Sequence, residues 1–140
     1  MDRKVLWLPN MQVGYEPLDK EHKSFVDIIN ESYDLLAQKK LDTFEDIFFQ
    51  IDAYMTRHFP HEELIMRQIV FPDVISHIES HRRFVIHINE LKKEFNGAKS
   101  SSDKEQVAGQ TADFIKAWFL GHTLSRDKVY KPYLVRLNYK

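Results

Sequence analysis

The distribution of apolar residues is the feature of this sequence that most restricts its fold. In four stretches they recur at alternating spacings of three and four, which is the pattern of a helix buried along one stripe. Only four glycines and five prolines occur in 140 residues, too few for the many turns of a β fold. We therefore expect an all-α protein with helices at about these ranges: 18–38, 43–70, 73–96 and 104–126.

The links between these stretches are short, which makes neighbouring helices antiparallel. This predicts an up-down-up-down four-helix bundle in a single domain that spans residues 1–140. Residues 1–17 are expected to form an irregular arm, with Trp7 and Tyr15 anchoring it over one end of the bundle. Residues 128–140 should form a short cap.

The sequence also predicts details of the helix ends. Asp42 or Thr43 is expected to cap the second helix at its N-terminus. The pair Asn96-Gly97 is a favoured C-terminus for the third helix. Residues 98–103, which include three consecutive serines, are expected to be a solvated loop.

Composition and charge exclude several classes of function. The chain has no cysteine, so disulfides, thiolate metal sites and cysteine nucleophiles are excluded. Twenty basic and 21 acidic residues leave a net charge of −1, which argues against a nucleic-acid-binding protein. The apolar run near the N-terminus covers only Val5–Leu8, far too short for a signal peptide or a membrane span. We therefore expect a cytoplasmic protein that binds neither nucleic acid nor a membrane.

Five histidines and one glutamate occupy stripe positions that should be apolar. A single histidine at such a position is usually a hydrogen-bonded core residue. Six buried polar side chains without partners would cost several kcal/mol each, whereas bound metal would satisfy them together. The six candidate ligands are His22, His58, Glu62, His77, His81 and His122.

These six residues should meet at one end of the bundle. In an antiparallel bundle the starts of the first and third helices lie beside the ends of the second and fourth. At about 1.5 Å per residue, all six side chains fall within a slab on the order of 10 Å thick. His58 and Glu62 are four residues apart and therefore share a face of their helix. The sequence thus predicts a site on which the six side chains converge.

The donor atoms restrict the metal. Imidazole nitrogens and carboxylate oxygens suit Fe, Zn, Mn, Ni or Cu, and six or seven donors are too many for one tetrahedral zinc ion. Two metals bridged by carboxylates would use them all. Asp127 follows His122 by five residues, about 140° round an ideal helix, so it joins only if the helix ends or bulges between them.

Three other residues near the candidate ligands have mainly structural interpretations. His61 is expected at the surface, with a place at the rim of the site as the alternative. His87 should be solvated, because it lies on the outer face of the third helix. Pro60 should kink or bulge the second helix, because it removes the hydrogen bond to the Thr56 carbonyl.

At this level of detail the sequence resembles the hemerythrins, most closely the bacterial single-domain kind. The resemblance covers nearly the whole chain and implies a non-haem di-iron site that binds O2 reversibly. It rests on these segments: Val13-Gly14, Leu18-Asp19-Lys20-Glu21-His22-Lys23, His58-Phe59-Pro60-His61-Glu62-Glu63, 77–81, 118–122 and Asp127-Lys128.

The resemblance also implies the ligand of each iron. One iron would be held by three histidines, and the other, which keeps an open coordination position, by two. Two carboxylates and a solvent-derived oxo or hydroxo group would bridge them. The three histidines of the first iron would be His77, His81 and His122, and the two of the second would be His22 and His58. The bridging carboxylates would be Glu62 and Asp127.

The O2 pocket implied by the resemblance would be lined by Phe25, Trp118, Phe119 and Thr123. Thr123 stands where the family commonly has isoleucine, and Phe119 where a smaller aliphatic residue is usual. The pocket should therefore be bulkier and more polar. The Thr123 hydroxyl is expected to hydrogen-bond the bound ligand or to admit water, which would speed autoxidation. The alternative is a bond back to a helix carbonyl.

Two alternatives to O2 carriage, storage or delivery remain open. One is a sensor of O2, NO or iron that acts through a protein partner. The other is a di-iron enzyme that reduces peroxide or NO with electrons from an unknown donor. Residues 126–140 include five basic residues and one acidic residue; we favour a solvated surface there, with a docking surface as the alternative.

Overall fold

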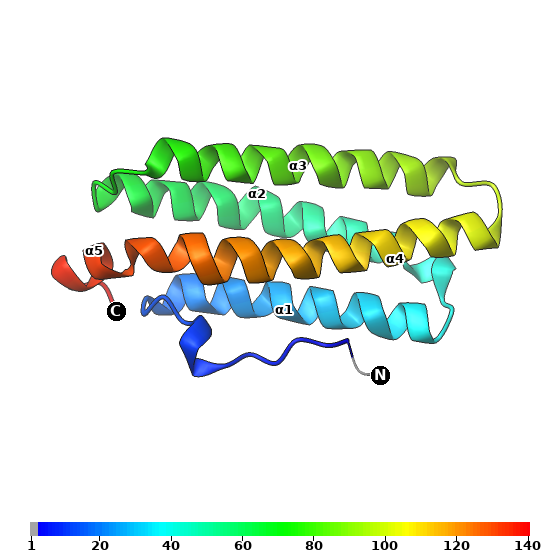
Figure 1. Ribbon diagram of the computed structural model, residues 1–140, viewed down its shortest axis with the longest axis horizontal. Helices are drawn as coiled ribbons and strands as arrows, with labels where there is room; N and C mark the ends of the chain where they lie inside the picture. Colours follow the sequence, from blue (N-terminus) through cyan, green and yellow to red (C-terminus); the bar gives the residue numbers. More distant parts are fainter. Residues whose placement is uncertain (1–2) are drawn as a thin grey trace.

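The computed structural model describes residues 3–140 and contains four long helices and no strand within that range. They are α1 (Glu16–Ala37), α2 (Glu45–Gln68), α3 (Val74–Gly97) and α4 (Ser101–Trp118). The helices run alternately in opposite directions and form an elongated bundle (Figure 1). The predicted all-α, up-down-up-down four-helix bundle is therefore confirmed.

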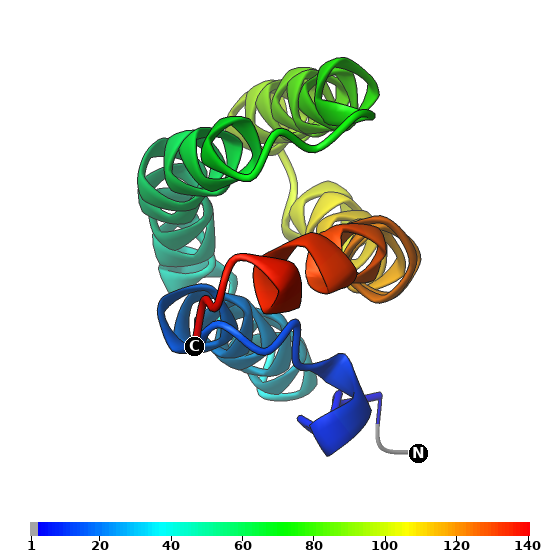
Figure 2. The same ribbon diagram turned by 90° about the vertical axis from the view of Figure 1, so that its left-hand side faces the viewer.

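The four helices surround a common core, which is seen from one end in Figure 2. α1 packs against α2 and α4, and α3 packs against the same two helices. After α4 the chain continues through a π-helical segment (Phe119–Arg126) and a 3₁₀ turn (Asp127–Tyr130) into the short helix α5 (Lys131–Arg136). α5 lies at the end of the bundle where α1 begins (Figures 1 and 2).

The C-terminal residues form a packed cap, as predicted. Tyr130 and Leu134 are buried in a small hydrophobic cluster with Leu18. The basic residues Arg136 and Lys140 are exposed, which agrees with the interpretation of a solvated basic surface.

The interior consists of two hydrophobic clusters on either side of a polar layer. The larger cluster includes Phe25 and Phe84, and the smaller one lies under the cap and includes Leu18 and Tyr130. Along α1, the buried His22 falls between Leu18 of the smaller cluster and Phe25 of the larger. The fold therefore holds a polar layer inside an otherwise apolar core.

The start of α2 differs from the prediction. A 3₁₀ turn, Leu41–Thr43, precedes the helix, and Phe44 is the N-cap residue without a side-chain cap. The Thr43 hydroxyl donates instead to the Lys40 carbonyl at 3.0 Å. The prediction that Asp42 or Thr43 caps this helix is therefore wrong, because the burial of Phe44 in the core sets where the helix begins.

Two other helices begin earlier than expected. The Ser100 side chain accepts a hydrogen bond from the Asp103 amide at 3.0 Å and caps α4. Residues 101–103 therefore belong to the first turn of α4 and not to a loop. α1 begins at Glu16, two residues before the predicted start, whereas α3 ends at Gly97 as expected.

Pro60 lies inside α2 without interrupting it. The helix is continuous from Glu45 to Gln68, so it shows no break or bulge at Pro60, and a kink there stays a prediction. Pro60 and Thr56, whose carbonyl loses its backbone partner, are both exposed. Water can therefore bond to that carbonyl, while the opposite face of α2 remains packed in the core.

The N-terminal arm follows the side of α1 (Figure 1). The Val5 amide donates to the Asn30 side chain at 2.7 Å, and the Asn30 side-chain amide donates to the Val5 carbonyl at 2.9 Å. These bonds hold the arm against the middle of α1, so Trp7 packs against the larger cluster. The prediction that Trp7 covers the bundle end is therefore wrong, whereas Tyr15 does lie there, in ring contact with Tyr139 at 5.2 Å.

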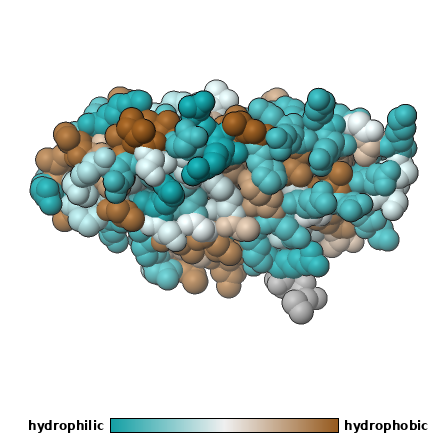
Figure 3. Space-filling view, turned by 45° about the horizontal axis from the view of Figure 1, so that its top comes forward, coloured by the Kyte–Doolittle hydropathy of each residue, from teal (hydrophilic) through white to brown (hydrophobic). Residues whose placement is uncertain are grey.

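Figure 3 shows one side of the molecule, on which hydrophobic side chains lie in separate patches among hydrophilic ones. The exposed hydrophobic residues of α3 include Ile75 and Ile86. Within the part of the chain that the structure describes, no helix is both long enough and apolar enough to cross a membrane.

Candidate metal centre

All four helices of the bundle, the fourth through its π-helical continuation, contribute polar side chains to one buried layer. α1 supplies a histidine, α2 a histidine and a glutamate, α3 two histidines, and the π-helical segment after α4 one histidine. Each of these residues is at most 5% exposed. The structure thus brings together all six residues that interrupt the apolar stripes: His22, His58, Glu62, His77, His81 and His122.

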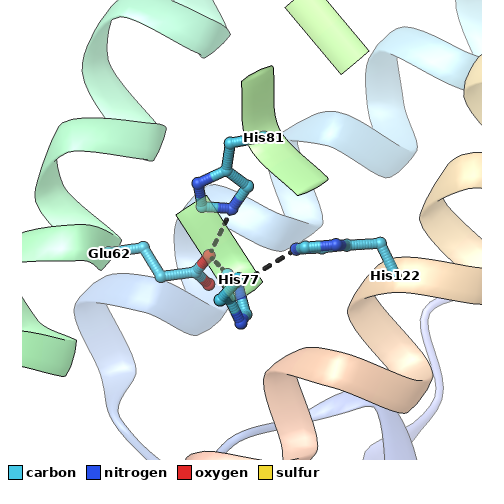
Figure 4. A group of neighbouring side chains, drawn as sticks. All are labelled: Glu62, His77, His81 and His122. Carbon is cyan, nitrogen blue, oxygen red and sulfur yellow. Dashed lines mark hydrogen bonds and ion pairs between the residues drawn. The ribbon is translucent and has the colours of Figure 1, made fainter. Parts of the chain in front are cut away.

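Glu62 lies at the centre of this layer, and Figure 4 shows its carboxylate directed at the histidines of α3. Its Oε1 atom is 3.0 Å from His77 Nε2 and 2.9 Å from His81 Nε2. Its Oε2 atom is 3.2 Å from His22 Nε2 and 3.5 Å from His58 Nε2. The two oxygens of one carboxylate therefore face two different pairs of histidines.

Asp127 joins the layer because the helix is wider than an α-helix here. Its amide donates to the carbonyl of His122, five residues back, which is the π-helical hydrogen bond. Asp127 Oδ1 is 2.9 Å from His77 Nε2 and 3.0 Å from His122 Nε2, and Oδ2 is 3.1 Å from His22 Nε2. From the sequence, Asp127 could join the site only if the helix ends or bulges after His122, and the structure contains such a bulge.

The donors fall into two groups that share Glu62. Within each group the potential ligand atoms all lie within 4.8 Å of one another. One group is Glu62, His77, His81 and His122, and the other is His22, His58, Glu62 and Asp127. Since Asp127 also contacts His77 and His122, both carboxylates span the two groups.

Several of these atoms are close together without being hydrogen-bonded. His81 Nε2 and both carboxylate oxygens of Asp127 are buried and have no hydrogen-bond partner among residues 3–140. They nevertheless lie 2.9–3.1 Å from neighbouring side chains. Their lone pairs are therefore not directed at one another. Metal ions between the donors would satisfy them, so the residues present fit such ions.

Further side chains hold the outer nitrogens of three histidines. Such contacts fix the ring orientation and leave Nε2 available to a metal. They join His58 Nδ1 to Glu21 at 2.7 Å, His81 Nδ1 to Glu63 at 2.9 Å, and His122 Nδ1 to Ser80 at 2.8 Å. Sequence reasoning missed these partners, although Glu21 and Glu63 stand directly beside candidate ligands in the chain.

His61 takes part in this outer set of contacts. Its Nδ1 atom is 3.0 Å from both carboxylate oxygens of Glu21, and its side chain is 30% exposed. The favoured interpretation of His61 as a plain surface residue is therefore wrong, because Glu21 reaches across from α1 to both His58 and His61. His87 is exposed, as predicted, and its ring stacks on Phe114.

Two tyrosines that sequence reasoning missed adjoin the layer. The Tyr130 hydroxyl donates to Glu62 Oε2 at 2.7 Å. The Tyr54 ring stacks on His58, with 4.8 Å between the ring centroids and 20° between the planes. Tyr54 stands four residues before His58 and hence on the same helix face, which was the available clue. Tyr130 lies beyond the fourth helix, where periodicity gives no information.

The buried groups strongly perturb one another's ionisation. Burial alone would raise the pKa of Glu62, but the surrounding histidines, His58 foremost, hold that pKa well below its usual range. Burial alone would lower the pKa of His22, but close contacts with Asp127 and Glu62 raise it to about 10. Burial likewise opposes the effect of Asp127 and Glu62 on His77, and the two carboxylates raise its pKa to about 9. Without metal these two histidines therefore hold protons at neutral pH.

The residues expected to line an O2 pocket lie beside the layer. The Phe25 ring is 6.0 Å from Phe119 and 6.1 Å from Trp118, measured between centroids, and Trp118 stacks on His122 at 4.3 Å. Thr123 is buried, and its hydroxyl has no hydrogen-bond partner within the described residues. The alternative in which Thr123 bonds to a helix carbonyl is therefore wrong, because the π-helical turn alters the spacing that such a bond requires.

The fold and the donor set together define a histidine-rich, metal-binding four-helix bundle. The sequence profile of the family described as Hemerythrin HHE cation binding domain matches residues 13–134. Since this match covers most of the 140 residues, the chain belongs to that family. The resemblance to the hemerythrins is thereby confirmed.

Individual relatives match over most of their length. A bacteriohemerythrin of Clostridium acetobutylicum is 26% identical over 129 residues, which cover 89% of this chain and 97% of the relative. A bacteriohemerythrin of Methylococcus capsulatus is 29% identical over 119 residues, with coverages of 83% and 85%. A wild-type hemerythrin of solved structure has a TM-score of 0.72 and 26% identity, with coverages of 93% and 97%.

Proposed function

We propose that this chain binds O2 reversibly at a non-haem di-iron centre. The observation that carries the proposal is that Glu62 and Asp127 each face histidines of both donor groups. Glu62 directs one oxygen toward each group, and so does Asp127. A carboxylate in that position is suited to bridge two metal ions, as carboxylates do in other four-helix di-iron proteins.

In this proposal the two irons have unequal sets of protein ligands. Three histidines and two shared carboxylates would hold one iron, and two histidines and the same carboxylates would hold the other. The iron with fewer protein ligands would have a coordination position available to O2. The two histidine sets are His77, His81 and His122 for the first iron, and His22 and His58 for the second.

The chain's own contribution is to position the ligands and to exclude water. Ferrous iron, when bound, supplies the electrons for O2 binding. Glu21, Glu63 and Ser80 fix three imidazole rings through their outer nitrogens. Phe25 and Phe119 are fully buried beside the layer and keep water from it. An apolar surrounding of this kind limits the access of water and protons, which promote autoxidation.

The donor set favours O2 binding over oxygen activation. Ferritin-like di-iron sites use four glutamates and two histidines, whereas this layer has five imidazoles and two carboxylates. Less negative charge stabilises high-valent iron less, so we infer carriage, storage or delivery of O2. NO would compete for the same position. Steady-state turnover with peroxide or NO and a reductant would support an enzyme instead.

Metal content combined with the visible spectrum tests this proposal. We expect two irons per chain, a colourless form after anaerobic reduction, colour on admission of air, and bleaching when O2 is removed. Two irons that oxidise once without releasing O2 would argue for a sensor or a redox enzyme. One zinc ion per chain, or no metal, would contradict the di-iron proposal.

A further inference from the structure

A layer of aromatic side chains lies immediately inside the candidate ligand layer, one helical turn nearer the middle of the bundle. Each long helix contributes one ring, three or four residues from its candidate ligand: Phe25, Tyr54, Phe84 and Trp118. The Phe25 ring contacts the other three, with centroid distances of 4.5 Å, 6.0 Å and 6.1 Å respectively. This aromatic layer therefore closes the site on the side away from α5.

Tyr54 brings a buried hydroxyl into the aromatic layer. Its side chain is 2% exposed, and the hydroxyl has no hydrogen-bond partner among residues 3–140. Native proteins rarely leave such a group unsatisfied, because it has given up its bonds to water. The Tyr54 hydroxyl therefore requires a partner that the described residues do not supply.

The stacking of Tyr54 on His58 locates that partner. The two residues are four apart on α2, so their rings project from the same face of the helix, and their planes are only 20° apart. A phenol is longer than an imidazole, so the Tyr54 hydroxyl reaches at least as far toward the axis of the bundle as His58 Nε2, beside the ligand layer. His58 belongs to the donor group with two histidines rather than three, where the proposed function leaves a position for an added ligand.

We propose that the Tyr54 hydroxyl is the hydrogen-bond donor to a small ligand with a negatively polarised outer atom, bound at the His22–His58 half of the centre. This inference rests on the proposed function. A phenol is protonated at neutral pH and can donate one hydrogen bond. Thr123 carries another buried hydroxyl without a partner among residues 3–140, but it follows His122, which belongs to the donor group with three histidines.

Azide binding to the air-oxidised, iron-loaded protein tests the proposal. Azide is a small anion whose antisymmetric stretch, observed by infrared spectroscopy, responds to hydrogen bonding. The variant is Tyr54→Phe, which removes only the hydroxyl. The matched control is Tyr33→Phe, since Tyr33 is a buried tyrosine of α1 whose hydroxyl donates to Asp113 at 2.7 Å.

We expect Tyr54→Phe to retain its iron and to bind azide about tenfold more weakly, the effect of one lost hydrogen bond. The azide band of the wild type should shift in D2O, and this shift should disappear in Tyr54→Phe but persist in Tyr33→Phe. If Tyr54→Phe fails to retain iron, an azide band of the wild type that is insensitive to D2O would itself overturn the proposal.

Other outcomes separate this inference from the proposed function. Unchanged azide affinity and an unchanged D2O shift in Tyr54→Phe would overturn the inference alone. So would a shift that disappears only in Thr123→Val, because the donor would then be Thr123. Absence of iron from all the proteins, wild type included, would overturn the proposed function and the inference with it.

Discussion

The Tyr130 hydroxyl donates a hydrogen bond to Oε2 of Glu62 at 2.7 Å. Both side chains are fully buried, and the same carboxylate oxygen faces His22 and His58. The bond joins the turn after α4 to the centre of the ligand layer. The C-terminal segment therefore does more than cover apolar residues, because it orients one of the two shared carboxylates.

Replacing Tyr130 with phenylalanine should weaken both the fold and the metal centre. We expect a loss of about 1–2 kcal/mol in the free energy of unfolding of the metal-free protein, because a buried bond to a carboxylate is removed. Iron affinity should fall about tenfold, as is usual when the partner of a ligand is lost. Urea unfolding and competition with a chelator measure the two effects. Tyr133→Phe, at a half-buried tyrosine of α5, is the control, and equal losses in both variants would contradict the assigned role.

Replacing Asp127 with asparagine should reduce the metal content of the protein. An amide has only one oxygen to coordinate with, so it cannot bridge two ions as the Asp127 carboxylate is proposed to do. We expect fewer than two irons per chain by elemental analysis. Asp113→Asn makes the same change at an exposed position of α4 and should leave the iron content unaltered. Two tightly held irons in Asp127→Asn would rule out the bridging role.

Replacing Glu21 with glutamine should weaken the hold of His58 on its metal. Glu21 contacts both His58 at 2.7 Å and His61 at 3.0 Å. Loss of such an outer contact typically costs 10- to 100-fold in metal affinity. Chelator competition should show a large effect for Glu21→Gln and a small one for His61→Ala, because only the former touches a candidate ligand. Equal effects would mean that His61 itself is required.

Replacing Thr123 with isoleucine should slow autoxidation of the O2-bound protein. The buried Thr123 hydroxyl has no partner among the described residues, so it can attract water toward the site. Isoleucine removes the hydroxyl and fills the same space. The rate is followed from the decay of the visible spectrum in air. Thr111→Val is the matched control, since the Thr111 hydroxyl already bonds to the Val107 carbonyl at 2.8 Å. An unchanged or faster rate in Thr123→Ile would contradict this prediction.

Loading with iron should release protons, and the affinity should rise with pH. Burial alone would lower the pKa values of His22 and His77, but Asp127 and Glu62 raise them to about 10 and about 9. Both values lie above the usual 6.5, so the metal-free protein holds these protons through neutral pH and loses them as pH rises toward 9–10. A metal ion must displace them, because it binds the neutral ring. Anaerobic calorimetry with Fe²⁺ in two buffers of different ionisation enthalpy measures the release. Equal heats in the two buffers would contradict it.

Much of the fold was predictable because a buried helix face requires a regular spacing of apolar residues in the sequence. A helix that packs on one side must carry apolar residues every three or four positions, and a histidine such as His22 or His77 on that side is visible as an exception. Antiparallel topology then placed the exceptions at one end of the bundle. The irregular turn before Asp127 was expected only because the resemblance to the hemerythrins implied Asp127 as a ligand, since a five-residue spacing from His122 does not fit one face of a regular helix.

The remaining features depend on contacts between distant segments. Trp7 follows α1 because of the bonds between Val5 and Asn30, and Tyr130 reaches Glu62 only after the chain has turned at the bundle end. Neither contact can be recognised from the spacing of apolar residues in the sequence. Some misses were avoidable, since a serine followed three residues later by aspartate, as at Ser100, is a recognised start of a helix.

A bundle made of ideal α-helices could not hold this set of side chains. Residues that share a face of an ideal helix are three or four apart, whereas His122 and Asp127 are five apart and meet only because Phe119–Arg126 is wide. Regularising this segment to an ideal α-helix without removing a residue would rotate everything downstream by about 100°, which would take Asp127 away from His122 and Tyr130 away from Glu62. A designer who transplants this site into a new scaffold must therefore transplant the distorted backbone with it, because the side chains alone do not encode the geometry.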